Sequence, residues 1–356
     1  MKSTSKQEIA VCCITDKSKG FGNFSRSVTI AEAMREKGYK IVFIINRNKS
    51  AIQELKSRKF TYMLIPMFES AGDYSHQISR ILNFRKCGTV IIDMREYGEQ
   101  ISKNLMNKHL KVILLDDAWC KKAYADIIFN GTMIKQNHQY KKINKASKIF
   151  VGPKYWIINR EFGKHKKTLR DIYDKQKYSV VVSVGGSDPH ELSLIVAKAL
   201  QKIDNIKITI IIGPFFENSV KLNQFVKNKN NFSLIFSPKK IWNDFLKSDV
   251  VISGAGNTLF ELSAQRIPTI CIATAEHQKP YAKTFESKGF AKNLGFWKNV
   301  KKDLVRRTVI QILNDKLKRR KMSLAGSKIL DGKQLLRVTE ILEKNINKHS
   351  SQLNRG

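Results

Sequence analysis

Short apolar runs rich in β-branched residues alternate with amphipathic stretches along most of this chain, and this alternation constrains the fold most. It is the pattern of βα units, in which helices join successive parallel strands. The expected strands are 9–15, 41–45, 62–66, 89–93, 111–115, 127–129 and 149–151, then 178–184, 206–212, 232–236, 249–253 and 268–273. The clearest expected helix is 26–37, with Gly38 as its C-cap.

The strands fall into two series separated by a polar, charged stretch at 161–177, which we expect to be a linker. A length of 356 residues also suggests two domains. We therefore predict an α/β fold with two doubly wound, Rossmann-like domains, 1–160 and 178–320, that face each other across a cleft. A basic helical tail is expected over 321–356.

The formal net charge of +35 is carried mostly by lysine, and its excess lies in the front half and the tail. Nucleic-acid readout favours arginine, which is much rarer here than lysine, and no known nucleic-acid recognition motif appears, so we expect no nucleic-acid partner. A contact with an anionic membrane or glycolipid stays open.

No apolar run approaches the ~20 residues of a membrane span, and no signal peptide is evident, so we expect a cytoplasmic protein, with peripheral membrane contact left open. The five cysteines form no CxxC pair and are expected to be reduced core residues.

Three glycine turns follow expected strands and open expected helices, where ligands bind in open α/β sheets. The first, at 16–26, holds Gly20 and Gly22, which allow close backbone approach beside a helix N-terminus suited to an anion. Ser25 stands where the dinucleotide motif GxGxxG has its third glycine. A ligand loop and an ordinary strand–helix turn are both open here.

The second turn, at 184–190, places Gly185 and Gly186 before Ser187 and Asp188, which are expected to cap a helix. A phosphate site and a capped loop are again both open.

The third turn, at 253–261, has small residues at 254–258 and then Glu261, about one helical turn beyond Thr258. We predict that its backbone N–H groups face a diphosphate while Glu261 accepts hydrogen bonds from ribose hydroxyls. The loop 273–278 follows the next strand and reaches the same edge of the sheet.

Asp116 and Asp117 end another expected strand. Adjacent strand residues point to opposite faces, so they are not expected to address one ligand, and we expect no metal site.

Six stretches, taken in order, resemble the UDP-sugar hydrolases of the pseudaminic acid pathway and the SpsG-like spore-coat polysaccharide proteins. This group is related to the peptidoglycan lipid-intermediate glucosaminyltransferase, of GT-B fold. The stretches are 20–26, 115–117, 152–162, 184–188, 253–261 and 275–278. The resemblance implies a role in surface polysaccharide biosynthesis and a UDP-sugar held between two domains. The nucleotide would lie mainly on the second domain, and the first loop would face the sugar. Cleavage of the anomeric C–O bond would release UDP, with no metal or other cofactor.

Two positions depart from the pattern of this family. Its first loop carries His in a GxGH motif where this chain has Asn23, and its later AxNQ motif carries Asn where this chain has His277. Asn does not accept a proton near neutral pH. We hypothesise that the roles are exchanged, with His277 reaching across the cleft to activate the nucleophile and Asn23 orienting it. Asp16 and Asp93 are the other candidate bases, and two independent losses in a protein of different activity stay open.

The residues expected at the substrate are Gly20, Gly22, Arg26, Gly185, Gly186, Ser187, Asp188, Gly254, Ala255, Gly256, Asn257, Thr258, Glu261 and Gln278. The first expectation for function is a hydrolase of the UDP-2,4-diacetamido-2,4,6-trideoxyhexose type. One alternative is a glycosyltransferase that moves a hexosyl group from a UDP-sugar to a lipid or glycan acceptor. Another is a non-catalytic nucleotide-sugar binder.

Overall fold

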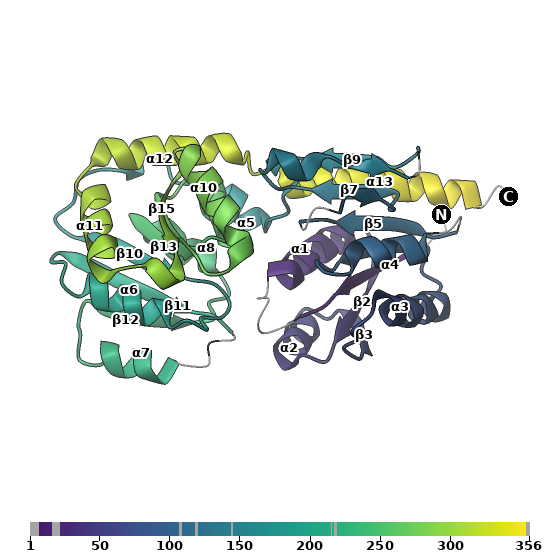
Figure 1. Ribbon diagram of the computed structural model, residues 1–356, viewed down its shortest axis with the longest axis horizontal. Coiled ribbons are helices and arrows are strands. Elements are labelled where there is room, and N and C mark those ends of the chain that lie inside the picture. Colours follow the sequence, from purple (N-terminus) through teal and green to yellow (C-terminus); the bar gives the residue numbers. More distant parts are fainter. Residues whose placement is uncertain are drawn as a thin grey trace. The chain divides into compact units, whose positions relative to one another are not determined.

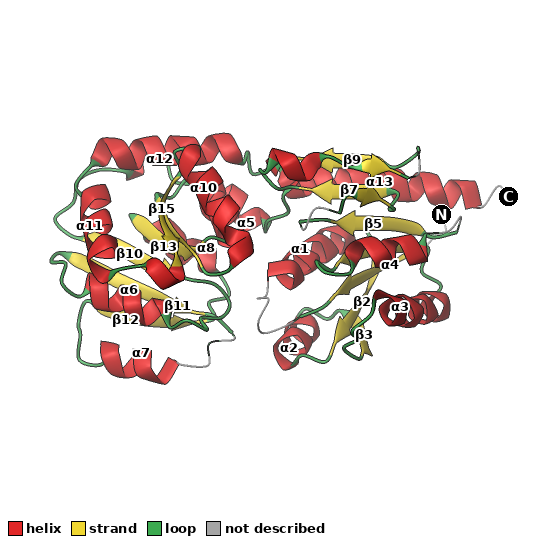
Figure 2. Ribbon diagram, viewed as in Figure 1, coloured by secondary structure: helices red, strands yellow, loops and turns green. Residues whose placement is uncertain are grey.

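The structure of this protein, a computed structural model, describes residues 7–15, 22–106, 109–117, 120–143, 145–214, 216 and 219–353, with side chains to 348 (Figure 1). The chain forms two units. Unit 1 comprises Met1–Ile158 and Lys333–Gly356, and unit 2 comprises Asn159–Gly332. In each unit a parallel sheet is covered by helices on its faces (Figure 2).

The sheet of unit 1 has the strand order β3-β2-β1-β4-β5-β7-β9, with parallel pairing throughout. Its strands are β1 (Glu8–Cys13), β2 (Lys40–Asn46), β3 (Thr61–Ile65), β4 (Thr89–Asp93), β5 (Lys111–Leu115), β7 (Ile127–Asn130) and β9 (Lys148–Val151). The order reverses between β1 and β4. This reversal makes a topological switch point, where the loops after the two strands diverge.

Helices cover both faces of this sheet because the side chains of β1 alternate between two cores. Ile9 and Val11 lie in a cluster with residues of α1, α2 and α13, whereas Ala10 and Cys12 lie in a cluster with residues of α3 and α4. The remaining elements are α1 (Gly22–Glu36), α2 (Lys49–Ser57), α3 (Ala71–Arg85), α4 (Gly98–Leu105), β6 (Lys122–Ala123), η1 (Lys135–His138), β8 (Lys141–Lys142), η2 (Pro153–Tyr155) and α13 (Gln334–Leu353).

The sheet of unit 2 has the strand order β12-β11-β10-β13-β14-β15 and is also parallel. Its strands are β10 (Tyr178–Ser183), β11 (Ile206–Ile212), β12 (Phe232–Phe236), β13 (Val250–Gly254), β14 (Thr269–Ala273) and β15 (Ala291–Phe296). Its helices are α5 (Arg160–Lys164), η3 (Leu169–Asp171), α6 (Leu192–Leu200), α7 (Ser219–Val226), α8 (Ile241–Lys247), α9 (Asn257–Gln265), η4 (Glu276–Gln278), α10 (Lys279–Ser287), η5 (Trp297–Asn299), α11 (Lys302–Leu313) and α12 (Lys316–Ile329). The order reverses between β10 and β13.

The predicted strands are all present, with ends shifted by at most two residues. The predicted C-cap is confirmed: Gly38 has a φ of +88°, and its N–H donates to the carbonyl of Arg35 just beyond α1. The strands β6, β8 and β15 were not predicted. The run of β15 contains Lys292, Asn293 and Gly295, which break the apolar pattern that marks the other strands.

Both predicted boundaries around the second domain need correction. Stretch 161–177 is part of unit 2, where α5 packs on α9 and the N–H of Lys167 donates to the carbonyl of Gln265. Stretch 321–356 is divided, because α12 lies in unit 2 and α13 in unit 1. Figure 1 shows α13, in yellow, beside β7 and β9. Its apolar residues at helical spacing are buried in the core of unit 1: Leu335, Val338, Leu342 and Ile346.

Candidate functional site

The loops after β10, β11 and β13 converge at the carboxyl edge of the sheet in unit 2. A Cβ added at Gly254 would lie 2.5 Å from the carbonyl oxygen of Val184, and one added at Gly213 would lie 2.5 Å from that of Gly186. Such distances leave no room for a side chain, so glycine is required where these backbones meet. Gly213 was not predicted as part of the site. It directly follows the apolar strand β11, just as the second and third predicted turns follow β10 and β13.

The third predicted turn presents an open helix N-terminus. Gly256 is the N-cap of α9, and no side chain of a described residue caps this helix. The Oε1 of Gln278 accepts hydrogen bonds from the N–H and the hydroxyl of Thr274, at 2.9 and 3.0 Å. This orientation leaves the Nε2 of Gln278 facing Gly256, 3.7 Å from where a Cβ would stand. Backbone N–H groups, the helix dipole and an amide NH₂ together suit a phosphate group.

Glu261 lies one turn further along α9 and is partly buried. Burial alone raises the pKa of its carboxyl to about 7. Among the described residues, none donates a hydrogen bond to it or pairs with it. A carboxylate shielded from water without a partner is costly, so such a group is a candidate for a functional site.

The second predicted turn is a capped loop. Gly185 has a φ of +131°, which favours glycine. Both carboxylate oxygens of Asp188 accept backbone hydrogen bonds at the start of α6, from Leu192 at 2.8 Å and Ser193 at 2.7 Å. The helix therefore begins at Leu192, later than expected, and its N-terminus is occupied by its own chain.

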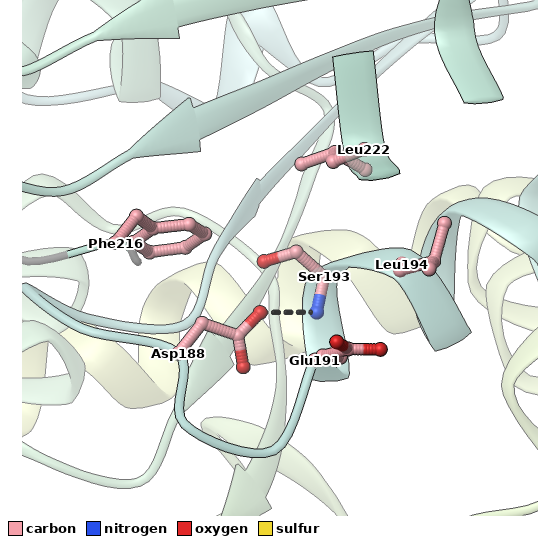
Figure 3. Close-up of a pocket in the computed structure, with 6 residues that line it drawn as sticks. All are labelled: Asp188, Glu191, Ser193, Leu194, Phe216 and Leu222. Carbon is pink, nitrogen blue, oxygen red and sulfur yellow. Dashed lines mark hydrogen bonds between the residues drawn. The ribbon is translucent and has the colours of Figure 1, made fainter. Parts of the chain in front are cut away.

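A cavity of about 10 Å³ lies beside this loop (Figure 3) and has room for about one water molecule. The Oγ of Ser193 is buried there without a hydrogen-bond partner among the described residues. The lining residues are Asp188, Glu191, Ser193, Leu194, Phe216 and Leu222. This cavity is far too small for a nucleotide.

The first predicted turn is only partly described. Asp16 and Gly20 lie outside the described residues, whereas Gly22 begins α1 and Asn23 is half-buried in its first turn. Arg26 is 6% exposed, and its guanidinium faces the end of β4. The sequence analysis predicted that Arg26 contacts the substrate, whereas here its side chain points into the protein toward Asp93.

Arg26 and Asp93 form a buried ion pair that holds α1 against β4. The Nε of Arg26 donates to Asp93 at 2.9 Å and its Nη2 donates to the other carboxylate oxygen, while the hydroxyl of Ser27 donates at 3.0 Å. Burial raises the pKa of Asp93, although Arg26 acts in the opposite direction. With both oxygens engaged, Asp93 is poorly placed to be the base suggested from the sequence.

Asp116 and Asp117 face different partners, as predicted. Asp116 accepts hydrogen bonds from the N–H of Cys120 at 2.8 Å and the hydroxyl of Tyr140 at 2.6 Å. Asp117 instead lies 3.5 Å from Nη1 of Arg26. No group of three His, Cys, Asp or Glu side chains is close enough to hold a metal ion within the described ranges.

His277 lies in η4, between the partly buried loop residues 275 and 278, and its side chain is exposed.

The five cysteines are buried and free, as predicted, and burial raises the pKa of the Cys271 thiol to about 12. In the part of the chain that is described, no helix is long and apolar enough to cross a membrane.

The chain is similar to several known proteins in sequence and in fold. No family model matches the chain. It is 28% identical over 281 residues to an uncharacterized protein of Methanocaldococcus jannaschii, a match that covers 76% of the chain but only 56% of that relative. It is 24% identical to the spore coat polysaccharide biosynthesis protein SpsG of Bacillus subtilis, over 91% of the chain and 94% of the relative. It is also 24% identical to the UDP-2,4-diacetamido-2,4,6-trideoxy-beta-L-altropyranose hydrolase of Campylobacter jejuni, over 76% and 93%.

Among solved structures, MurG of Acinetobacter baumannii is similar, with a TM-score of 0.67 and 13% identity over 95% of this chain and 100% of that one. The fold is thus that of the GT-B proteins, with two Rossmann-like units, as predicted. The resemblance to SpsG-like proteins and to the UDP-sugar hydrolases of the pseudaminic acid pathway is confirmed as well.

Proposed function

We propose that this protein processes a UDP-sugar, breaking the bond between the anomeric carbon and the UDP oxygen, with water as the acceptor. The observation that carries the proposal is the partly buried Glu261, which has no partner among the described residues and lies beside the N-terminus of α9. Two relatives whose names describe UDP-sugar hydrolases support the proposal.

The residues of unit 2 have separate roles in this proposal. The N–H groups at residues 256–258 and the Nε2 of Gln278 bind the diphosphate, and the carboxylate of Glu261 accepts hydrogen bonds from the ribose hydroxyls. When the C–O bond breaks, its electron pair leaves with UDP, and water supplies the oxygen that bonds to the anomeric carbon. The helix N-terminus then stabilises the negative charge that develops on the departing phosphate.

Calorimetric titration with UDP tests the nucleotide site. The change Glu261→Gln removes a charged acceptor, so we expect UDP to bind at least about 10-fold more weakly. The matched control is Glu276→Gln, because the Glu276 side chain is 74% exposed and pairs with Lys279, one turn away. Equal affinity of the wild type and the Glu261 variant for UDP would contradict the proposal.

A panel of UDP-sugars that includes deoxy-acetamido sugars, assayed for free UDP, separates the candidate functions. UDP release without an acceptor identifies the hydrolase. Release only when cell lipid extract or glycan is added identifies a glycosyltransferase, which the fold also supports. Stabilisation against melting with no release identifies a non-catalytic binder.

His277 is our proposed general base, because the position of the family histidine is held by Asn23. His277→Ala is expected to abolish UDP release and leave UDP affinity unchanged. Unchanged turnover would exclude this role.

Peripheral contact with an anionic membrane is a further part of the proposal, supported by the lysine excess of the front half of the chain. Binding to phosphatidylglycerol vesicles that disappears at high salt is the expected result. No binding at low salt would exclude the contact.

A further inference from the structure

Unit 1 contains a second set of polar groups without hydrogen-bond partners among the described residues, after the strands β4 and β5, next to the switch point between β1 and β4. Asp117 follows β5, and Arg95 follows β4, the strand next to it. Ligands of open α/β sheets bind beyond the carboxyl ends of strands at such a reversal. Nothing in the nucleotide site of unit 2 involves these residues.

The carboxylate of Asp117 is left with one unused acceptor. Asp117 is 7% exposed, and its Oδ1 accepts no hydrogen bond from any described residue. A buried polar atom without a partner costs about 1–3 kcal/mol, so native proteins rarely keep one without a ligand or water to satisfy it.

Arg95 provides unused donors beside that oxygen. Its side chain is 34% exposed, and its Nη1 lies 3.8 Å from Oδ1 of Asp117. This distance is too long for a hydrogen bond. Within the described ranges, Arg95 donates no hydrogen bond to any residue.

The separation of 3.8 Å matches a single hydroxyl group placed between the two side chains. An oxygen about 2.8 Å from both atoms would donate its proton to Oδ1 and accept one from Nη1, since a hydroxyl is both donor and acceptor. A phosphate or carboxylate does not suit this place, because its oxygens would face the carboxylate of Asp117. The surrounding charges also balance, with Arg26 and Arg95 opposite Asp93 and Asp117.

We propose that Arg95 and Asp117 form a hydroxyl-binding site in unit 1 that holds a hydroxyl group of a sugar ligand. This inference rests on the proposed function for its ligand class. The hydroxyl belongs either to the sugar of the UDP-sugar or to a separate acceptor sugar, and the two sources have the same chemistry at this site.

Two titrations test the site, each with the wild type, Asp117→Asn, Arg95→Gln and the double variant. In the first, the affinities for UDP and for UDP-N-acetylglucosamine are compared, which detects a donor sugar. In the second, free N-acetylglucosamine is titrated into the protein with UDP present, which detects a separate sugar. In one of these arms we expect each single variant to weaken the sugar-dependent affinity about 10-fold while the UDP affinity is unchanged.

The double variant makes the test sharper. If both side chains hold one hydroxyl, removing the second partner adds little to the loss, so the double variant should resemble the weaker-binding single variant. Losses that multiply would contradict a shared hydroxyl. The controls are Arg80→Gln and Asp204→Asn, which make the same chemical changes at exposed positions.

The outcomes distinguish this inference from the proposed function. If UDP does not bind the wild type, the proposed function fails, and the titration with free sugar still decides the present inference. If UDP binds but neither variant changes any sugar-dependent affinity, the pair holds water only and the inference is wrong. Arg95→Gln, at a partly exposed position, keeps the test valid if Asp117→Asn fails to fold.

Discussion

Two carboxylates of this protein, Asp93 at the end of β4 and the partly buried Glu261 in α9, differ in what surrounds them. Asp93 is held by Arg26 and Ser27, and its contacts explain its place in the fold. Glu261 has no such partner in the described part of the chain, and its removal from water raises the pKa of its carboxyl. A carboxyl such as Glu261 changes its protonation when a ligand supplies the missing partner. This change can be measured in solution through its effect on the pH dependence of stability.

The stability of the ligand-free protein should therefore depend on the protonation of Glu261. Its pKa is about 7 in the folded state, against a usual value of 4.5. Because the folded state holds the proton more tightly, the contribution to the free energy of unfolding is full below about pH 4.5 and is lost as the pH rises through 7. We expect a loss of about 3 kcal/mol between these limits.

Urea unfolding of the wild type and Glu261→Gln at pH 5 and pH 8 measures this contribution. The variant lacks the titrating group, so the difference between the two proteins should change with pH in the stated direction. A difference independent of pH would mean that Glu261 is solvated like a surface carboxyl.

Sequence reasoning reached some of the site residues and not others. The turn at 253–258 and Glu261 follow from small residues after a strand and a carboxylate one turn later. The capping role of Asp188 was also one of the two interpretations open from the sequence, since its partners lie only four and five residues away. The inward direction of Arg26 instead depends on a tertiary contact with Asp93, which local spacing does not encode.

At the scale of the element, the close approach of the ends of β10 and β13 requires that residue 254 has no side chain. Gly254→Ala would place a methyl group 2.5 Å from the carbonyl oxygen of Val184, so the strand ends must move apart. We expect a loss of about 1–3 kcal/mol in the free energy of unfolding, together with weaker UDP binding.

Gly256→Ala is the matched control for stability in that experiment. The nearest atom to its added methyl group is the Nε2 of Gln278 at 3.7 Å, an ordinary contact, and its φ of −105° is open to alanine. Chemical denaturation of both variants measures the difference, and equal stability would show that the strand ends adjust freely.

Helix α13 contributes to the stability of unit 1 through one face. Leu342 is fully buried in that core, whereas Leu336 on the same helix is 54% exposed. We expect Leu342→Ala to lower the free energy of unfolding by about 2–5 kcal/mol and Leu336→Ala to change it by less than about 0.5 kcal/mol. Similar effects of the two substitutions, measured by urea unfolding, would contradict the burial of this face.

The apolar spacing of α13 was visible in the sequence, but the unit on which it packs was not. The sequence predicts that positions 335, 338 and 342 share a face. An apolar helix face can pack against many apolar surfaces, and the spacing does not say which. In the structure, this face of α13 packs beside α1. For the same reason the strand pattern gave the fold class while the division at Ile158 and Lys333 had to come from the structure.

At the scale of the whole molecule, the two units have separate cores and should respond separately to nucleotide. A ligand that binds one folded unit stabilises it by about 2.7 kcal/mol at a concentration 100 times its Kd. In scanning calorimetry we expect UDP to raise the transition assigned to residues 159–332 more than the other.

Hydrogen exchange in the same conditions assigns the transitions, because peptides from α9 and β13 report on unit 2 and peptides from α1 and β4 report on unit 1. Protection by UDP confined to unit 1 would move the nucleotide site away from Glu261.

The return of α13 to unit 1 also affects how the protein is made. Residues 159–332 are continuous in the sequence, so they emerge from the ribosome with everything their own sheet requires. The first half emerges earlier, yet one wall of its interior is formed by α13, which follows the whole of unit 2 in the sequence. During translation this half must therefore wait, with part of its apolar surface uncovered, until α13 has been synthesised.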